Sequence, residues 1–314
     1  MKSMINKTYI EGLLYEHDLT KKVSGPDSKT PGTPFISGSI SIATDDNITN
    51  IVNVSYQYVT EKTKAGAENK TFTFLEDLID NRINYVMKDG KDKAVKVRVN
   101  SAIGVNDFYT ENRETKEIEL VSAKRNEGGF IHVVDVLSTP EVQRSTFECD
   151  IIITKVTRKE ANEEKQIPEK VIVKGATFDF RGALLPIELS ATDEAAMSYF
   201  EGLNASATEP VFTKVWGRQV SETIVRTFVQ ESAFGPDSVR EVTNTRKDFV
   251  ITGAAKEPYI WDDETSITAA ELQTAAAARE TYLATVKQRY LDYKNKPQAT
   301  APAAVSVQPG GFSF

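Results

Sequence analysis

The segment Phe212–Arg218 alternates aromatic and basic residues with small or apolar ones. In a β-strand, successive side chains point to opposite sides of the sheet, so that every second residue shares a face. One face of this segment would carry Phe212, Lys214, Trp216 and Arg218, and the other Thr213, Val215 and Gly217. Aromatic rings can stack on the bases of a single-stranded nucleic acid, while neighbouring cations neutralise its phosphates. The alternation therefore predicts a nucleic-acid-binding face, here called the Trp216 ladder, with the small residues on the buried side.

Two further pairs of residues extend this hypothesis. In the first half of the chain, valines alternate with Lys96 and Arg98, and burial of the valines would direct both cations outward. Arg226 and Phe228 share a face of the strand expected after the ladder, and would stand beside it if the two strands pair. Basic side chains on an outward face are also commonly just solvated, and this plainer interpretation stays open for both pairs.

Four more aromatic residues are candidates for base stacking. Tyr56 and Tyr58 are two positions apart and share a face of a predicted strand, whereas Phe108 and Tyr109 follow the basic segment in a predicted loop. Aromatic residues on strands more often belong to a core than to a binding surface. Both interpretations stay open for these four residues.

The residue types that commonly carry catalysis are scarce. The chain has two histidines, His17 and His132, and one cysteine, Cys149, at an alternating position typical of a buried small apolar residue. The motifs G-x-x-x-x-G-K-[ST], G-x-G-x-x-G, G-x-S-x-G and H-E-x-x-H are absent from the sequence. The acidic group at 262–264 precedes a predicted helix, where carboxylates complement the helix dipole. We expect neither an enzyme nor a cofactor or metal site.

The composition is that of an ordinary globular protein, with 40% hydrophobic and 26% charged residues among 314. The net charge is −7, and because Lys296 is the single charged residue of 295–314, the rest of the chain carries −8. A nucleic-acid-binding face would then be a local positive groove in a negative surround, with an affinity that falls steeply with salt. One cysteine excludes a disulfide framework. Because the sequence has neither the apolar core of a signal peptide nor a stretch of ~18 apolar residues, we expect a cytoplasmic location.

Period-2 alternation of Val, Ile, Thr and aromatic residues dominates the chain and predicts a mostly β protein. In the first half, strands are predicted at 8–15, 35–43, 51–60, 94–99, 118–123 and 130–136, with a helix over 72–87. In the second half, strands are predicted at 147–158, 170–180, 184–191, 211–218, 223–230, 239–243 and 249–252, with a helix over 194–203. Thr192 or Asp193 could cap that second helix.

Each half thus contains three strands, one helix, and two or more further strands. The five-stranded Greek-key barrel called the OB-fold has this order, with its helix between the third and fourth strands. A β-sandwich could hold the strands, but it would not require a helix at the same place in both halves. We therefore expect two OB-like barrels, in residues 1–143 and 144–262.

The last sixth of the chain has a different pattern. Thr268 and Glu271 form a capping box that opens a helix. The apolar positions that follow at intervals of three or four are Leu272, Ala276, Leu283, Val286, Tyr290 and Tyr293, with Arg279 at the remaining position. The stripe favours a helix within residues 263–296 that packs on its own domain over one that forms a coiled coil with a partner.

The tail at 297–314 is rich in Ala, Pro, Val and Ser, which predicts a disordered linker. Phe312 and Phe314 stand at its end with no core to join. Aromatic residues in such a place suggest a short peptide that docks on a partner protein.

Two sets of segments resemble known nucleic-acid-binding proteins. The stretch Val211–Arg218 is similar to the V-x-x-W-G-[KR] strand of bacterial and phage single-stranded DNA-binding proteins, and the tail resembles their protein-docking tip. The whole chain also resembles long replication-module proteins of tailed phages, through segments 146–150, 213–217, 231–235 and the final Gly-Gly-Phe-x-Phe. This resemblance implies an OB-fold that binds single-stranded DNA during phage replication or recombination.

The sequence thus favours a non-enzymatic, sequence-tolerant single-stranded DNA-binding viral protein, located in the host-cell cytoplasm. The residues predicted to contact DNA are Lys214, Trp216, Arg218, Arg226, Phe228, Lys96, Arg98, Tyr56, Tyr58, Phe108 and Tyr109, and those predicted to dock on a partner are Phe312 and Phe314. The alternative is a β-rich structural protein of a phage particle, such as a capsid or tail component. Thr and Val richness, acidity and abundant strands suit that alternative equally well.

Overall fold

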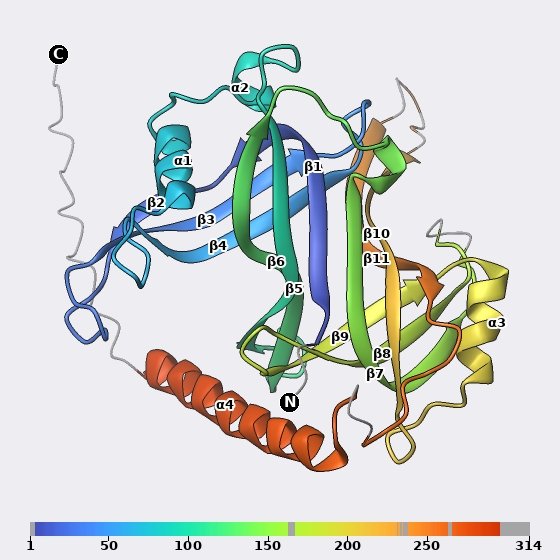
Figure 1. The fold of residues 1–314 in the computed structure, drawn as a ribbon. Coiled ribbons are helices and arrows are strands. Elements are labelled where there is room, and N and C mark those ends of the chain that lie inside the picture. The colour runs from blue at the N-terminus through green and yellow to red at the C-terminus, as the bar shows by residue number, and fades with distance from the viewer. Residues whose placement is uncertain are drawn as a thin grey trace, which may run out of the picture.

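The computed structural model describes residues 4–162, 167–230, 232, 234, 238–262 and 266–295, and only the backbone of 222–230, 241–244 and 246. Strands make up most of the ordered elements, and a single long helix follows the last strand (Figure 1). The expectation of a mostly β chain with a C-terminal helix is therefore confirmed.

Five strands close the first barrel. They are β1 (Asn6–His17), β3 (Pro34–Ala43), β4 (Ile51–Thr60), β5 (Lys96–Glu111) and β6 (Ile118–Val134). Around the barrel β1 pairs with β3, β3 with β4, β4 with β6, β6 with β5, and β5 with β1, and only the β4–β6 pair is parallel. The short edge strand β2 (Thr20–Val23) pairs with β3, and the helices α1 (Lys70–Ile79) and α2 (Val86–Asp89) connect β4 to β5.

The second barrel repeats this arrangement. After the 3₁₀ turn η1 (Glu141–Gln143), its elements are β7 (Ser145–Lys159), β8 (Lys170–Phe178), β9 (Leu184–Ala191), α3 (Glu194–Gly202), β10 (Val211–Gln230) and β11 (Ser238–Ala254). Strand β7 pairs with β8 and β10, β8 with β9, and β10 with β11, while β9 and β11 pair in parallel. Both halves thus have the Greek-key closure of the OB-fold, as their element order predicted.

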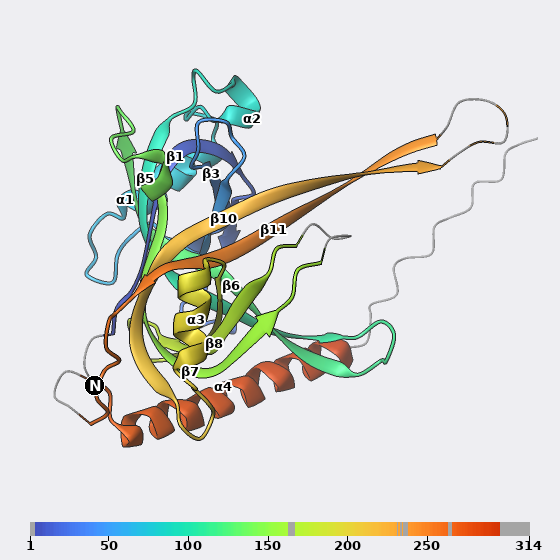
Figure 2. The same ribbon diagram turned by 90° about the vertical axis from the view of Figure 1, so that its right-hand side faces the viewer.

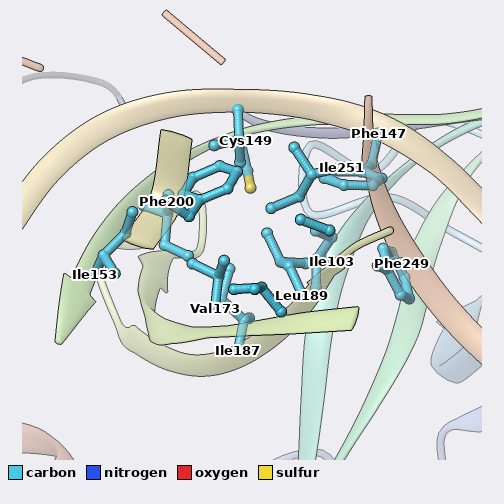
Figure 3. Packing of buried hydrophobic residues seen from close by; sticks show 14 of the residues in the cluster. Ile103, Phe147, Cys149, Ile153, Val173, Ile187, Leu189, Phe200, Phe249 and Ile251 are labelled. Atoms are coloured by element: carbon cyan, nitrogen blue, oxygen red, sulfur yellow. The ribbon is translucent and has the colours of Figure 1, made fainter. Parts of the chain in front are cut away.

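Alternation along the strands builds a core inside each barrel. On β7 it directs Phe147, Cys149 and Ile151 inward, where Phe200 of α3 packs against the same cluster (Figure 3). Asp193 begins α3 by accepting hydrogen bonds from two backbone N–H groups, which agrees with its predicted capping role. Burial raises the pKa of the Cys149 thiol, so this cysteine is the small core residue that its position predicted.

A shared strand joins the two barrels into one eleven-stranded sheet. The first half of β1 pairs with β5 on one side and with β7 on the other. In the β1–β7 pair the register runs from Asn6 opposite Cys149 to Ile10 opposite Ser145. Strands β10, β7, β1 and β5 are consequently neighbours, and their outward side chains form one surface.

Several elements differ from their predicted extents. The segment predicted as one helix contains α1 and α2, because Asn81 after α1 has φ +59°, which a right-handed helix cannot continue. Strand β6 continues through Gly128, where two strands were predicted. The four short strands predicted at 211–252 are two long ones, and Figure 2 shows β10 and β11 extending together beyond the barrels as a two-stranded ribbon.

The C-terminal helix α4 (Ala269–Asn295) begins with the predicted capping box: the backbone N–H of Thr268 donates to Glu271, and that of Glu271 to the Thr268 hydroxyl. Arg279 then contacts both barrels. Its guanidinium pairs with Asp107 of β5 at 2.8 Å and donates to the carbonyl of Leu184 on β9 at 3.1 Å. The helix therefore packs on the body of the chain, as predicted, but it bridges the two barrels instead of covering one.

Candidate nucleic-acid interface

The outer face of the joined sheet brings together predicted residues from both halves of the chain. Trp216 lies opposite Glu148 on β7, which in turn lies opposite Lys7 on β1. Residues directly opposite in an antiparallel pair share a face. Trp216 and Lys7 therefore point to the same side, although 209 positions separate them and two different barrels supply them.

The next row along the strands extends the same face into β5. Arg218 lies opposite Thr146, Thr146 opposite Tyr9, and Tyr9 opposite Asn100. Two residues further along β1, Glu11 lies opposite Arg98. Because alternate residues of β5 share a side, Lys96 also belongs to this face.

These rows border a groove of about 1000 Å³. Among its lining residues are Lys7, Tyr9, Asn100, Thr146, Trp216 and Arg218. The Trp216 side chain is 41% exposed and packs on Gly253 of β11, where a Cβ atom would overlap the indole ring. An exposed indole beside Lys7, Tyr9 and Arg218 supplies the flat apolar surface and the cations that a single strand of nucleic acid requires.

The burial pattern predicted for the Trp216 ladder is confirmed in part. Thr213, Val215 and Gly217 are buried, as expected for the opposite face. Phe212, however, is 1% exposed, because Tyr259 and Trp261 from the segment after β11 cover its ring at centroid distances of 4.6 and 5.9 Å. Phe212 thus belongs to a small core and offers no surface for stacking.

The cations of this face differ in their surroundings. Lys214 pairs with Glu148 and Arg98 with Glu11, whereas among the described residues no ion pair involves Lys7 or Arg218. The Lys96 ammonium donates to the carbonyl of Asp135 at 2.9 Å. The face holds five cations, Lys7, Lys96, Arg98, Lys214 and Arg218, and three carboxylates, Glu11, Glu148 and Asp150. It is therefore locally positive on a chain whose net charge is −7.

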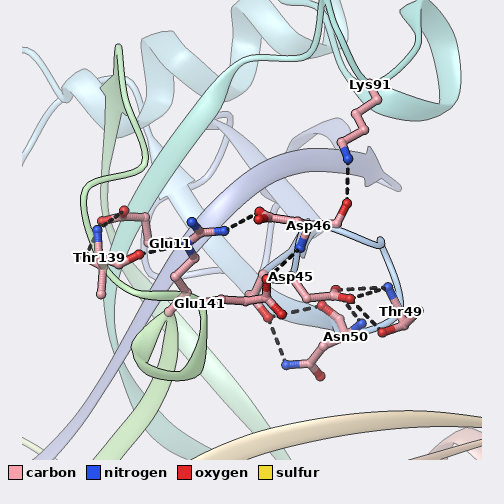
Figure 4. Close-up of polar contacts among 10 residues, drawn as sticks. Glu11, Asp45, Asp46, Thr49, Asn50, Lys91, Thr139 and Glu141 are labelled. Carbon is pink, nitrogen blue, oxygen red and sulfur yellow. Dashed lines mark hydrogen bonds and ion pairs between the residues drawn. The ribbon is translucent and has the colours of Figure 1, made fainter.

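A buried carboxylate organises one end of the face. The Glu11 side chain is fully buried and accepts hydrogen bonds from the Tyr9 hydroxyl and from Arg98 Nε, the latter at 2.9 Å. It also accepts one from the backbone N–H of Thr139 at 3.1 Å (Figure 4). Burial opposes its charge, but the hydrogen bonds from Tyr9, Thr139 and Arg98 outweigh that cost and lower the pKa of Glu11 to about 2. Glu11 thus fixes Tyr9 and Arg98 to each other and fastens the segment between the barrels to β1.

The sequence did not single out Lys7 or Tyr9. Their alternation on β1 was visible, but the residues that lie beside them come from β7 and β10, far along the chain. No local pattern states which strands pair. The one local signal for these two residues was that Lys7 is basic and Tyr9 aromatic, whereas the strand continues with mainly apolar residues.

One of three comparisons with known proteins assigns the chain to a family. The sequence model of the YorF family matches residues 5–289, which is most of the chain. The chain belongs to the YorF family. No curated protein matches the sequence. Among solved structures, this YorF-family chain is similar to a deletion mutant of the single-stranded DNA binding protein from Thermus aquaticus, with 10% identity, a TM-score of 0.46, and coverage of 84% of this chain and 100% of that one.

The remaining predicted contact residues of this YorF-family chain lie away from the groove. Tyr56 is 2% exposed and packs in the first core, so the prediction that it stacks on bases is wrong. Tyr58 is exposed and lies on β4, but it does not line this groove. Phe108 and Tyr109 lie on β5 and not in a loop, at the end of the strand nearest α4, where Lys287 is 5.9 Å from the Tyr109 ring centroid.

Arg226 and Phe228 do not form a strand beside the ladder, because they continue the same strand, β10. Their backbones pair with Val242 and Arg240 of β11 in the ribbon beyond the barrels. At about 3.3 Å per residue, Arg226 lies roughly 33 Å along the strand from Trp216. Phe312 and Phe314 lie outside the described residues.

The side chains considered for catalysis make packing contacts and hydrogen bonds that support the fold of this YorF-family chain. The His17 ring packs edge-on against Tyr85 at 5.3 Å between centroids, and burial lowers its pKa. Asp262 accepts a hydrogen bond from the backbone N–H of Ala269 at the start of α4. Within the described part of the chain, no three His, Cys, Asp or Glu side chains cluster as a metal site, and no helix is long and apolar enough to cross a membrane.

Proposed function

We propose that this chain is a non-enzymatic, sequence-tolerant single-stranded DNA-binding protein. The observation that carries the proposal is the exposed Trp216 indole on one sheet face with Lys7, Tyr9 and Arg218, around a groove of about 1000 Å³. Bases would stack on Trp216 and Tyr9, while Lys7, Arg218, Lys96 and Arg98 neutralise phosphates. Because stacking uses the π-face that every base has, such binding is tolerant of sequence.

The architecture supports the same function. Trp216 and Tyr9 lie on β10 and β1, separated by β7 and offset by two residues, so their backbones are about 12 Å apart at the usual strand spacing and rise. The strands hold both rings on a rigid surface, and Glu11 restricts Tyr9 further by accepting its hydroxyl hydrogen bond. Rings that are ordered before binding lose little conformational entropy when a base stacks on them.

The biological setting of the proposal comes from the sequence resemblance to phage replication-module proteins. We propose that the chain acts in phage DNA replication or recombination, and that Phe312 and Phe314 dock on a partner protein of that process. Removal of residues 309–314 should then abolish capture of the partner while leaving affinity for DNA unchanged.

Intrinsic fluorescence tests the function directly, because the chain has only two tryptophans, Trp216 and Trp261. Poly-thymidine oligonucleotide should quench the emission to saturation, more strongly at about 50 mM than at about 300 mM salt. Trp261→Phe should retain the quenching, since Trp261 is half-buried and donates to the carbonyl of Pro210 at 3.2 Å. Absence of any change at the lower salt would refute the proposal, and large assemblies without DNA would support a virion component instead.

A further inference from the structure

The wall of the first barrel opens between β4 and β6. These strands pair in parallel only where Val54 lies opposite Asn126 and Ser55 opposite Glu127. Directly after this pair, Gly128 and Gly129 have φ of +62° and +132°, and the register between β5 and β6 shifts at the same point. A bulge of this kind bends a strand and redirects the side chains that follow it. The bulge at the two glycines thus coincides with the end of the pairing between β4 and β6.

The bulge also determines the position of Phe130. A Cβ atom at residue 129 would overlap the carbonyl oxygen of Asn100, so only glycine fits there. The next residue, Phe130, is 73% exposed. Phe130 therefore presents its ring to the solvent outside the barrel.

A second groove of about 820 Å³ occupies the gap. Its lining includes Tyr58 from β4, Phe130 from β6, Lys62 and Lys64 after β4, and Arg181 from the turn between β8 and β9 of the second barrel. Among described residues, no ion pair involves these three cations, and Glu61 is the one carboxylate among the residues that line the groove. The groove therefore combines two aromatic rings with a positive charge.

Two of these residues are held in place before any ligand binds. The Tyr58 hydroxyl is 2.8 Å from the Ser24 hydroxyl and 2.7 Å from that of Thr30, and its ring packs on Phe35 at 4.6 Å. The turn that carries Arg181 is fixed by Asp179, which accepts hydrogen bonds from the backbone N–H groups of Arg181 and Ala183, both at 2.8 Å. Because the Tyr58 side chain and the backbone of the Arg181 turn are ordered before binding, a ligand would lose less conformational entropy in fixing them.

The two grooves adjoin. Asn100 lines the Trp216 groove, and it lies directly opposite Phe130, which lines the second groove. The Cα atoms of such partners are about 5 Å apart. A strand that crosses Tyr9 and Asn100 thus meets Phe130 next.

We infer that the second groove binds a further base of the same single-stranded DNA, by stacking on Phe130 and Tyr58, while Arg181, Lys62 and Lys64 neutralise the adjacent phosphates. This inference rests on the proposed function and extends it. The first barrel supplies the stacking rings of this groove and the second barrel supplies Arg181, so the DNA would contact both barrels twice.

Oligonucleotides of two lengths test the inference. Phe130 lies four strand spacings, about 19 Å, from the strand of Trp216. A poly-thymidine of about 3 nucleotides on Trp216 is too short to reach the second groove, whereas one of about 15 nucleotides can reach it. Phe130→Ala and Arg181→Ala should each weaken binding of the longer DNA, and for Phe130→Ala the loss of affinity should be about 5- to 150-fold. Neither variant should change the quenching of Trp216 by the shorter DNA. Tyr293→Ala and Arg289→Ala, which remove exposed residues of α4, are the matched controls.

The outcomes separate the two proposals. If wild-type protein binds both lengths and the Phe130 and Arg181 variants bind the longer DNA equally well, the second groove is not a DNA site and the Trp216 groove still is. An equal loss of affinity for the shorter and the longer DNA would also overturn the inference, because it would mean that the substitution acts on the Trp216 groove or on the fold. If the wild-type protein binds neither length, the proposed function itself fails. Phe130→Leu, which keeps an apolar side chain but no ring, distinguishes loss of stacking from a change in folding.

Discussion

Trp216 on β10 and Lys7 on β1 face the same side of one sheet because each lies opposite Glu148 on β7. Strand β7 belongs to the second barrel and β1 to the first. The proposed binding face consequently exists only when both barrels are present and joined. Neither barrel alone presents an aromatic platform flanked by both Lys7 and Arg218.

Replacement of Trp216 is the most direct test of the platform. Trp216→Ala should weaken binding of single-stranded DNA by about 1 to 3 kcal/mol, since one stacked base is lost. The fold should be unaffected, because the indole is 41% exposed and fills no core position. Equilibrium titration with a labelled oligonucleotide measures the change. Tyr293→Ala, which removes an exposed aromatic side chain of α4, should bind like the wild type.

Lys7 and Arg218, which form no ion pair with any described residue, should control the salt dependence of DNA binding. For single strands, the slope of log K against log salt changes by about 0.7 for each phosphate contact. Lys7→Ala and Arg218→Ala should each lower the magnitude of the slope by about that amount, and the double variant by about twice as much. Titrations at several salt concentrations measure the slope. An unchanged slope in both variants would mean that these two side chains do not meet phosphates.

The close contact between Trp216 and Gly253 offers a steric test. A Cβ atom on residue 253 would overlap the indole ring, so Gly253→Ala should displace it, shift its emission maximum and weaken DNA binding about fivefold or more. Gly202→Ala is the matched control, because a Cβ atom there meets nothing within 4 Å. Fluorescence spectra and titrations of the two variants check the prediction, and identical behaviour of both would contradict it.

The buried Glu11 should make stability depend on acid pH. Its pKa is lowered to about 2 from an ordinary 4.5, so its contribution to stability is present above pH 4.5 and is lost as the pH falls toward 2. Glu11→Gln should lower the free energy of unfolding by about 3 kcal/mol at neutral pH. The difference from wild type should shrink as the pH falls below 4.5.

Urea unfolding at neutral pH and at about pH 3 measures this difference. A constant difference at all pH values would show that the charge of Glu11 contributes nothing. Asp92→Asn, on an exposed residue beside α2, should behave like the wild type at each pH.

Local patterns in the sequence predicted much of the secondary structure. The capping box of Thr268 and Glu271 and the Asp193 cap are at the helix starts they predicted. Alternation correctly assigned Val215 to a buried face and Trp216 to an exposed one. Strand ends were predicted less well: the break expected near Gly128 is a bulge within one strand, because a bulge accommodates glycine without ending the pairing.

The candidate site was predicted only in pieces. The sequence identified Trp216, Arg218, Lys96 and Arg98 but gave no reason to place the two pairs on one surface. The sequence also could not show that Phe212 is buried and Trp216 exposed, since alternation places both on the same face of one strand. Tyr259 and Trp261 cover the first ring and leave the second open, and they come from a segment more than forty residues further along the chain.

The sequence by itself determined which residues of each strand share a side, where the helices begin, and the order of elements that both barrels follow. Only the tertiary structure decided that β1 pairs with β5 and β7 at once, that Lys7 and Tyr9 join the Trp216 face, and that a gap opens beside Phe130. The physical reason is that side-chain alternation is a local property of a strand, whereas every strand edge offers the same N–H and C=O groups to any partner. Pairing and register are therefore selected by the packing of the whole chain.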